Sequence, residues 1–202
     1  MVAIIDYDAG NIKSVEKALL SLSQEACITR DKDKILSADH VILPGVGAFG
    51  DAMEKLENYD LIPIIQDVCK RGTPFLGICL GLQLMFDRSD EAPGVKGLSL
   101  LPGDIVKIPE GEYKKIPHMG WNSLELTGNG RLFEGINDNP YVYFVHSYYL
   151  QAKDESIVKA TTEYNVKIHA SVEKDNIFAC QFHPEKSSDI GLKMLSDFVN
   201  IR

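Results

Sequence analysis

The chain has 202 residues and a formal net charge of −8, from 29 acidic and 21 basic side chains. Its 45% hydrophobic and 25% charged residues are typical of a globular protein, and we expect one domain over residues 1–202. No basic stripe is present, which argues against a nucleic-acid partner. No apolar run approaches the ~20 residues that span a bilayer, so we expect no membrane association and a cytoplasmic location.

The four cysteines give no sign of a metal site or a disulfide framework. None of them forms a C-x-x-C pair, so reduced thiols are expected and no metal site is predicted. They stand at Cys27, Cys69, Cys79 and Cys180.

The first half of the chain alternates short apolar runs with amphipathic segments. Apolar residues recur every three or four positions over 11–23, which predicts a helix with one buried face. Alternating strands and helices indicate an α/β fold with a mostly parallel sheet covered on both faces. The strands are expected at 2–6, 26–30, 40–44 and 74–78, and further helices at 51–56 and 61–72.

The second half contains a denser series of short alternating segments, which is typical of antiparallel strands. A final helix is expected over 190–201, where helical spacing returns. No linker separates the halves, so we expect them to share one sheet system. The strands of this half are expected at 104–108, 122–126, 141–150, 156–162, 166–172 and 176–182.

The stretch "PGVGAFG" has the spacing G-x-G-x-x-G at Gly45, Gly47 and Gly50. In dinucleotide-binding proteins this spacing lets backbone approach a pyrophosphate. Here Pro44 precedes the first glycine, and the stretch follows the third strand-like run instead of the first. No strand-terminal acid follows after about 20 residues to bind a ribose. A nucleotide is therefore disfavoured, and we expect no cofactor.

A second glycine-rich turn, "FLGICLG", resembles a nucleophile elbow. Gly77 and Gly81 flank Cys79 between a buried strand at 75–78 and a helix at 82–86. The glycines relieve crowding at the turn, and the helix N-terminus favours a thiolate. The motif alone leaves two interpretations open, a nucleophile or a small core residue.

A cysteine nucleophile needs a base and a group that orients the base. His183 and Glu185 are two residues apart in "QFHPEKS", so their side chains face the same side of an extended segment. With Cys79 they form a candidate triad for acyl transfer. The same alternation places Cys180 in the core. His146 lies in an aromatic strand, where it either lines a pocket or has a structural role.

Acyl transfer also requires N–H donors for the oxyanion. The glycine-rich turn at Val46 and Gly47 follows a neighbouring strand, where such donors would lie. A second donor is expected from Leu80, directly after the nucleophile. The glycine-rich stretch is thus predicted to be an oxyanion loop.

The segments "GICLGLQLMF" and "QFHPEKS" resemble the class I, triad-type glutamine amidotransferases, and the resemblance covers nearly the whole chain. It implies a three-layer, flavodoxin-like α/β fold with a mixed, mostly parallel sheet and an added antiparallel region in the second half. It implies release of ammonia from L-glutamine by the triad. The glutamine-binding residues that it implies are Gly47, Gln83, His146, Ser147 and Tyr148.

Within this family, "LPGVGAFGDAM", "PHMGWN", "YFVHSYY" and "IDYDAGNIKSV" are similar to the glutaminase subunits of imidazole glycerol phosphate synthases of histidine biosynthesis. That similarity implies a heterodimer with a (β/α)8-barrel cyclase, which receives the ammonia through a channel. The cyclase forms imidazole glycerol phosphate and an aminoimidazole carboxamide ribotide, a lyase reaction. The implied interface residues are Asn11, Trp121, Tyr143 and Lys186. Without a partner, Asn11 would be a helix N-cap and Trp121 a packing residue. Tyr143 would be a core residue and Lys186 a solvated lysine.

Family behaviour also suggests that activity rises when the partner holds its acceptor. We therefore hypothesise that the backbone at 45–47 rests with an N–H turned away from the oxyanion site. One departure from the family is visible, because Asp8 replaces a glycine of the pattern D-Y-G-x-G-N. Aspartate tolerates turns, so we expect a local adjustment without loss of function.

Three alternatives remain on the sequence alone. The chain could serve another acceptor, as the anthranilate-type and pyridoxal phosphate-type glutaminases do. It could be a cysteine peptidase or γ-glutamyl hydrolase with the same elbow. A non-catalytic protein that holds a nucleotide at the first glycine-rich turn is the third.

Overall fold

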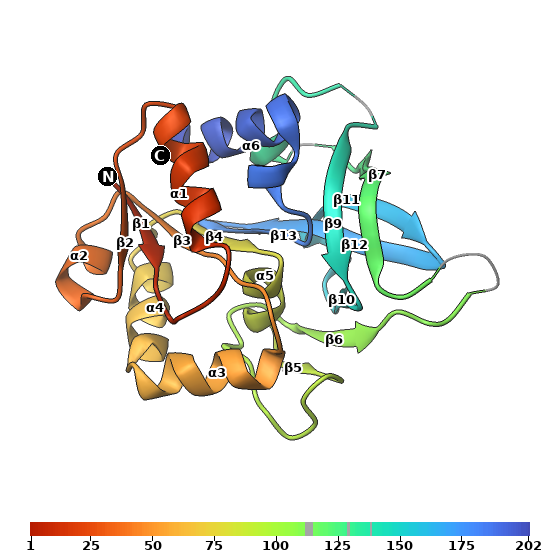
Figure 1. The fold of residues 1–202 in the computed structure, drawn as a ribbon, viewed down its shortest axis with the longest axis horizontal. Coiled ribbons are helices and arrows are strands. Elements are labelled where there is room, and N and C mark those ends of the chain that lie inside the picture. The colour runs from red at the N-terminus through yellow and green to blue at the C-terminus, as the bar shows by residue number, and fades with distance from the viewer. Residues whose placement is uncertain (112–114, 129, 138) are drawn as a thin grey trace.

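The computed structural model describes residues 1–111, 115–128, 130–137 and 139–202. Its first part alternates strands and helices, as the hydrophobic pattern predicts (Figure 1). The strands are β1 Val2–Ile5, β2 Ala26–Thr29, β3 His40–Leu43 and β4 Phe75–Ile78. The helices are α1 Ile12–Ser21, α2 Lys32–Leu36, α3 Phe49–Asn58, α4 Leu61–Lys70 and α5 Leu80–Leu84.

The later part is mainly antiparallel, as expected, and ends in a helix. Its strands are β5 Arg88–Ser89, β6 Gly103–Lys107, β7 His118–Ser123, β8 Glu125–Leu126, β9 Tyr141–His146, β10 Tyr148–Ala152, β11 Val158–Tyr164, β12 Val166–Lys174 and β13 Ile177–Cys180. The 3-10 turns are η1 Arg131–Phe133, η2 Glu155–Ile157 and η3 Pro184–Lys186, and the last helix is α6 Ser188–Asn200.

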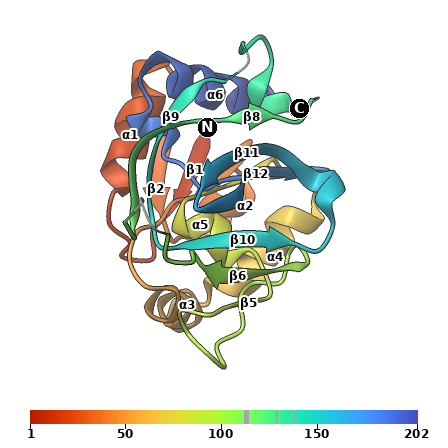
Figure 2. The ribbon, with the colours of Figure 1, turned by 90° about the vertical axis from the view of Figure 1, so that its right-hand side faces the viewer.

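One mixed sheet joins the two parts, in the order β2-β1-β3-β4-β13-β12-β10-β6-β5. Every neighbouring pair from β2 to β13 in this order is parallel. The next two pairs, β13 with β12 and β12 with β10, are antiparallel. Figure 2 views the molecule from the side of this antiparallel region. The last strand, β13, therefore lies beside β4 although about a hundred residues separate them in the sequence.

Helices cover both faces of the sheet and give three layers (Figure 1). One apolar core joins a face of the sheet to α2, α3, α4 and α5, and a second core joins the other face to α1 and α6. The strands β1, β3 and β4 are buried at every position because helices cover them on both sides. Within the described ranges, no helix is long and apolar enough to cross a bilayer.

The aromatic run at 141–150 differs from its prediction as one strand. It divides at Ser147 into β9 and β10, which belong to different sheets. β9 pairs with β7 in a separate two-stranded ribbon, while β10 joins the main sheet between β6 and β12. Alternation alone could not reveal this division, because both halves keep a strand-like pattern.

Asp8 makes the local adjustment that the sequence suggests. It adopts a left-handed backbone with φ 60°, the conformation that glycine takes most easily. Its carboxylate accepts hydrogen bonds from Arg30, at 2.6 Å, and from the Tyr59 hydroxyl. The Lys55 ammonium donates to the Asp8 carbonyl. These contacts fix the loop between β1 and α1.

Candidate active site

Cys79 occupies a strained turn between β4 and α5. Its φ of 55° and ψ of −106° lie outside the usual regions, as expected of a nucleophile elbow. A Cβ on Gly81 would lie 1.8 Å from the Leu43 carbonyl oxygen, and one on Gly77 would lie 2.8 Å from the Gly81 oxygen. Both flanking positions therefore require glycine, because backbone passes where a side chain would stand.

The pairing of β4 with β13 brings the candidate base to the cysteine. Ile78 is in register with Cys180, and the Cys79 N–H donates to the Cys180 carbonyl at 2.8 Å. Residues 181–183 therefore pass the elbow directly after β13 ends. His183 Nδ1 lies 2.7 Å from Glu185 Oε1, in the pairing predicted from the i, i+2 spacing.

The electrostatic environment of His183 fits a general base. With its Nδ1–H donated to Glu185, the neutral ring presents a lone pair on Nε2. That Nε2 is buried and has no hydrogen-bond partner among the described residues. Burial lowers the pKa of His183, but interactions with Cys79 and Glu185 outweigh it, so the pKa lies above its ordinary value. The ring is thus poised to take a proton from the thiol.

Two residues that sequence reasoning missed hold this arrangement. The buried Gln181 donates through Nε2 to Cys79 Sγ at 3.8 Å. The buried Ser187 hydroxyl donates to the His183 carbonyl at 2.6 Å and accepts the Tyr143 N–H. The available signal for Gln181 was its position between Cys180 and His183, two residues before the candidate base in the same segment. Nothing in the sequence pattern identified Ser187.

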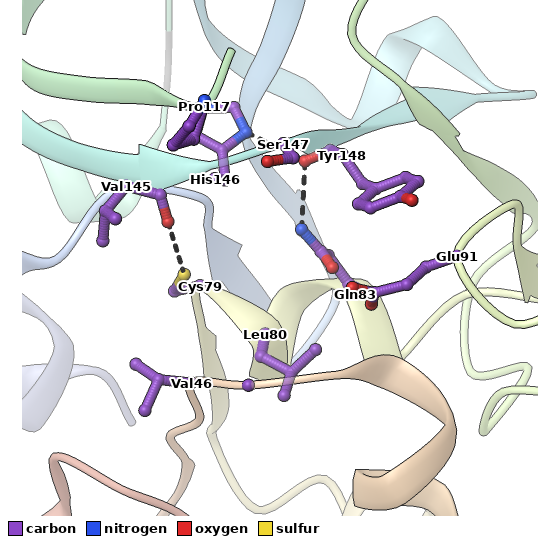
Figure 3. Close-up of a pocket in the computed structure, with 11 residues that line it drawn as sticks. Val46, Cys79, Leu80, Gln83, Glu91, Pro117, Val145, His146, Ser147 and Tyr148 are labelled. Carbon is purple, nitrogen blue, oxygen red and sulfur yellow. Dashed lines mark hydrogen bonds between the residues drawn. The ribbon is translucent and has the colours of Figure 1, made fainter.

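A pocket of about 370 Å³ opens beside Cys79 (Figure 3). The residues predicted to bind glutamine or the oxyanion all line it, together with the predicted nucleophile. Figure 3 also shows the Cys79 thiol directed to the Val145 carbonyl, and the Gln83 amide directed to the Tyr148 carbonyl. The lining residues are Val46, Gly47, Cys79, Leu80, Gln83, Glu91, Pro117, Val145, His146, Ser147 and Tyr148.

The His146–Tyr148 segment is held by a buried pair of histidines. His146 Nδ1 lies 2.8 Å from the Tyr148 carbonyl, and its Nε2 lies 2.9 Å from His118 Nδ1. Since a carbonyl only accepts, Nδ1 of His146 carries the proton. Burial lowers the pKa of His146 to about 4, so its ring is neutral near pH 7. His146 thus both lines the pocket and supports its wall.

The oxyanion loop lies against the elbow, but one predicted donor is occupied. The Leu80 N–H donates to the Gly45 carbonyl at 3.3 Å. Val46 is 37% exposed, and Gly47 has a φ of 112°, which favours glycine. The predicted role of Leu80 as an oxyanion donor stays a prediction, which requires the Gly45 carbonyl to leave the Leu80 N–H.

Comparison with known proteins shows the family of this chain. The family model for glutamine amidotransferase class-I matches residues 3–201. The chain belongs to the class I glutamine amidotransferase family. It is 50% identical over 201 residues to "Imidazole glycerol phosphate synthase subunit HisH" of Bacillus cereus strain G9842, covering all of this chain and 95% of that protein. It is 51% identical over 203 residues to the protein of that name from Bacillus mycoides strain KBAB4, with the same coverage.

Solved structures share the class I amidotransferase fold at lower identity. A structure described as a glutamine amidotransferase superposes with a TM-score of 0.76 at 19% identity, over 98% of this chain and 99% of the other. PurLQS from Thermotoga maritima gives a TM-score of 0.75 at 21% identity, over 98% and 97% of the two chains. The predicted three-layer α/β fold with a mixed, mostly parallel sheet is confirmed.

Glu91 is the pocket residue of this class I amidotransferase that sequence reasoning missed. Its Oε2 accepts the Phe49 N–H at 2.8 Å, at the start of α3. It is the one carboxylate among the described residues that line the pocket. The loop between β5 and β6 carries it there, and no local motif marked it in advance.

The residues expected at a partner interface do not share one environment. Trp121 is 52% exposed on β7, and its ring meets the partly buried Tyr143 of β9 edge to face. Lys186 is exposed. Asn11 instead turns its side chain inward, where Nδ2 donates to Glu185 Oε1. Its side chain makes no capping hydrogen bond to α1, so the alternative interpretation of Asn11 as an N-cap is wrong.

Proposed function

We propose that this chain is the glutaminase subunit of an imidazole glycerol phosphate synthase. It would hydrolyse L-glutamine and pass the ammonia to a cyclase subunit. The full-length similarity to proteins of that name supports the biological role. The observation that carries the chemistry is the buried His183–Glu185 pair beside Cys79, which lines the pocket.

In the proposed reaction, His183 Nε2 takes the thiol proton while Cys79 Sγ attacks the side-chain carbonyl carbon of glutamine. The tetrahedral intermediate collapses when the imidazolium gives its proton to the leaving nitrogen, so ammonia departs and a thioester remains. Water then attacks the thioester with His183 again as base. Glutamate leaves, and the free thiol is restored.

The pocket offers complementary groups for the amino-acid end of glutamine. The Glu91 carboxylate would bind the α-ammonium through the oxygen that does not cap α3. Gln83 and the backbone of Ser147 and Tyr148 would bind the remaining polar groups, as family resemblance implies. The Gln181 amide would stabilise negative charge on Cys79 Sγ.

The glycine-rich loop gives a physical account of partner-dependent activity. The Gly45 carbonyl takes the Leu80 N–H that an oxyanion would need. A rearrangement of the backbone at 45–47 would free Leu80 and present the Val46–Gly47 peptide to the oxyanion. Glycine makes this change sterically cheap, and a partner could shift its equilibrium.

A cyclase would bind over the ribbon of β7 and β9, which borders the pocket. Its outward face carries Met119, Trp121 and Tyr141, which are 65%, 52% and 61% exposed. Large apolar side chains gathered at one surface mark an interaction site. Pro117 and Val145 of the same region line the pocket, so a partner there would cover its mouth. We propose a (β/α)8-barrel cyclase in a heterodimer, with Lys186 at the rim.

Ammonia release from glutamine tests the proposal, first with the chain alone and then with a histidine-pathway cyclase and its nucleotide acceptor. We expect strong stimulation by the complete pair. Cys79→Ala should abolish release in both conditions, whereas Cys69→Ala, which removes a thiol from α4, should retain it. Retained turnover in Cys79→Ala would refute the triad. Release without any response to the cyclase would refute the assigned partner.

A further inference from the structure

We propose that Asn11 is a positioning residue of the triad, which holds the Glu185 carboxylate in line with His183. The inference rests on the proposed function and assigns Asn11 a role in it. The Asn11 amide Nδ2 donates to Glu185 Oε1, the same oxygen that accepts from His183 Nδ1 at 2.7 Å. A residue 174 positions away in the sequence therefore completes the hydrogen bonding of the carboxylate.

Glu185 has few other ways to be stabilised. Its side chain is 0% exposed, and its Oε2 is buried without a hydrogen-bond partner among the described residues. Two titratable groups that interact with it are His183 and the buried thiol of Cys180. Among the described residues, the Asn11 amide is thus the one hydrogen-bond donor besides His183 that the structure gives this carboxylate. Without it, the buried carboxylate would lose a hydrogen bond that fixes its orientation, and its hold on His183 would weaken.

The backbone of Asn11 is arranged for this contact and not for helix capping. Its φ of 69° and ψ of 4° are left-handed, a conformation that asparagine tolerates better than most residues. The side chain makes no capping hydrogen bond to α1. The left-handed turn directs the amide to Glu185 instead.

The neighbouring contacts of Asp8 hold the loop in place. Its ion pair with Arg30 and its bond to Tyr59 tie the loop to the end of β2 and to the end of α3. Three residues further on, Asn11 reaches the triad. The loop is therefore fixed at both ends, and the Asn11 amide needs little ordering to meet Glu185.

Kinetics of ammonia release by the full chain, in complex with the cyclase and its acceptor, test this role. Asn11→Gly removes the amide and keeps the left-handed backbone accessible. We expect kcat to fall about 10- to 100-fold, the kinetic equivalent of a lost hydrogen bond to a charged group. KM for glutamine should change little, because Asn11 does not line the pocket. Lys13→Ala, at an exposed position of α1, is the matched control and should leave both values unchanged.

Asn11→Asp adds a signature that a general loss of stability would not give. It is nearly isosteric but places a second carboxylate beside Glu185, and two close carboxylates cannot both ionise easily. Relative to the unmodified chain, its kcat should be lowest near pH 8 and recover towards pH 6, where one shared proton restores a donor.

The outcomes separate the two proposals. An unmodified complex that releases no ammonia would refute the glutaminase assignment. An active complex in which Asn11→Gly keeps its kcat would refute the positioning role alone. Equal relative losses of Asn11→Asp at both pH values would also refute it, and so would an equal loss in Lys13→Ala.

Discussion

The tight packing at the elbow predicts that one methyl group on Gly81 disables the site. The added Cβ would lie 1.8 Å from the Leu43 carbonyl oxygen, whereas ordinary contact begins at 3.4 Å. The obstacle is the backbone of β3, which cannot turn aside as a flexible side chain could. The start of α5 must therefore move away from β3, and Cys79 must move with it.

Gly81→Ala should lower the free energy of unfolding by about 1–3 kcal/mol, the usual cost of overpacking a core. A shift of about 1 Å at the nucleophile should also reduce kcat on the order of 100-fold. Urea denaturation measures the first effect, and ammonia release with the cyclase present measures the second.

Gly50→Ala is the matched control. Its Cβ would meet the Ala92 side chain at 3.4 Å, an ordinary contact, and Gly50 lies in the first turn of α3 without a positive φ. We expect unchanged activity and a stability equal to or up to about 1 kcal/mol above that of the unmodified chain. If Gly81→Ala matched Gly50→Ala in both assays, the steric account of the elbow would be wrong.

Two further predictions concern the pocket. Because the pKa of His146 is lowered to about 4 in the fold, its contribution to stability is full above its unfolded pKa of about 6.5 and is lost as pH falls through the folded value. Between about pH 7 and pH 5, the free energy of unfolding measured by urea denaturation should fall by roughly 2 kcal/mol from this cause. The free energy of unfolding of His146→Gln should depend less steeply on pH. An identical pH dependence in the two proteins would contradict the assignment to His146. Glu91→Gln keeps an acceptor for the Phe49 N–H but removes the charge, so KM for glutamine should rise roughly 10-fold with a smaller change in kcat. An unchanged KM would exclude Glu91 from binding the α-ammonium.

On the proposed function, the geometry gives a reason for glutamine hydrolysis to depend on a partner. The proposed nucleophile Cys79 and base His183 are already held in place, since Gln181, Glu185 and Ser187 contact them from one short segment after β13. The proposed oxyanion site is the part that would have to change, because the Gly45 carbonyl takes the Leu80 N–H. A partner therefore needs to move only a glycine-rich loop, and the fold of the subunit can stay unchanged.

Several features could be predicted from the sequence because they depend on residues that are close together in the chain. The 3.6- and 2-residue periodicities predicted most helices and strands, because burial of one face imposes them. Glycines around Cys79 marked the elbow, since a strained turn crowds any side chain there. The two-residue spacing of His183 and Glu185 predicted their hydrogen bond correctly, but the reason was wrong, because residues 184–186 form the 3-10 turn η3 instead of the extended segment that was expected.

Only the tertiary structure decided which distant segments meet. The sequence pattern contains no distance information between β4 and β13, yet their pairing brings His183 to Cys79. The division of 141–150 between two sheets, the approach of Glu91 to the pocket and the contact of Asn11 with Glu185 depend in the same way on packing between elements. Periodicity indicates which face of an element is buried. Which other element packs against that face depends on the free energy of the whole fold.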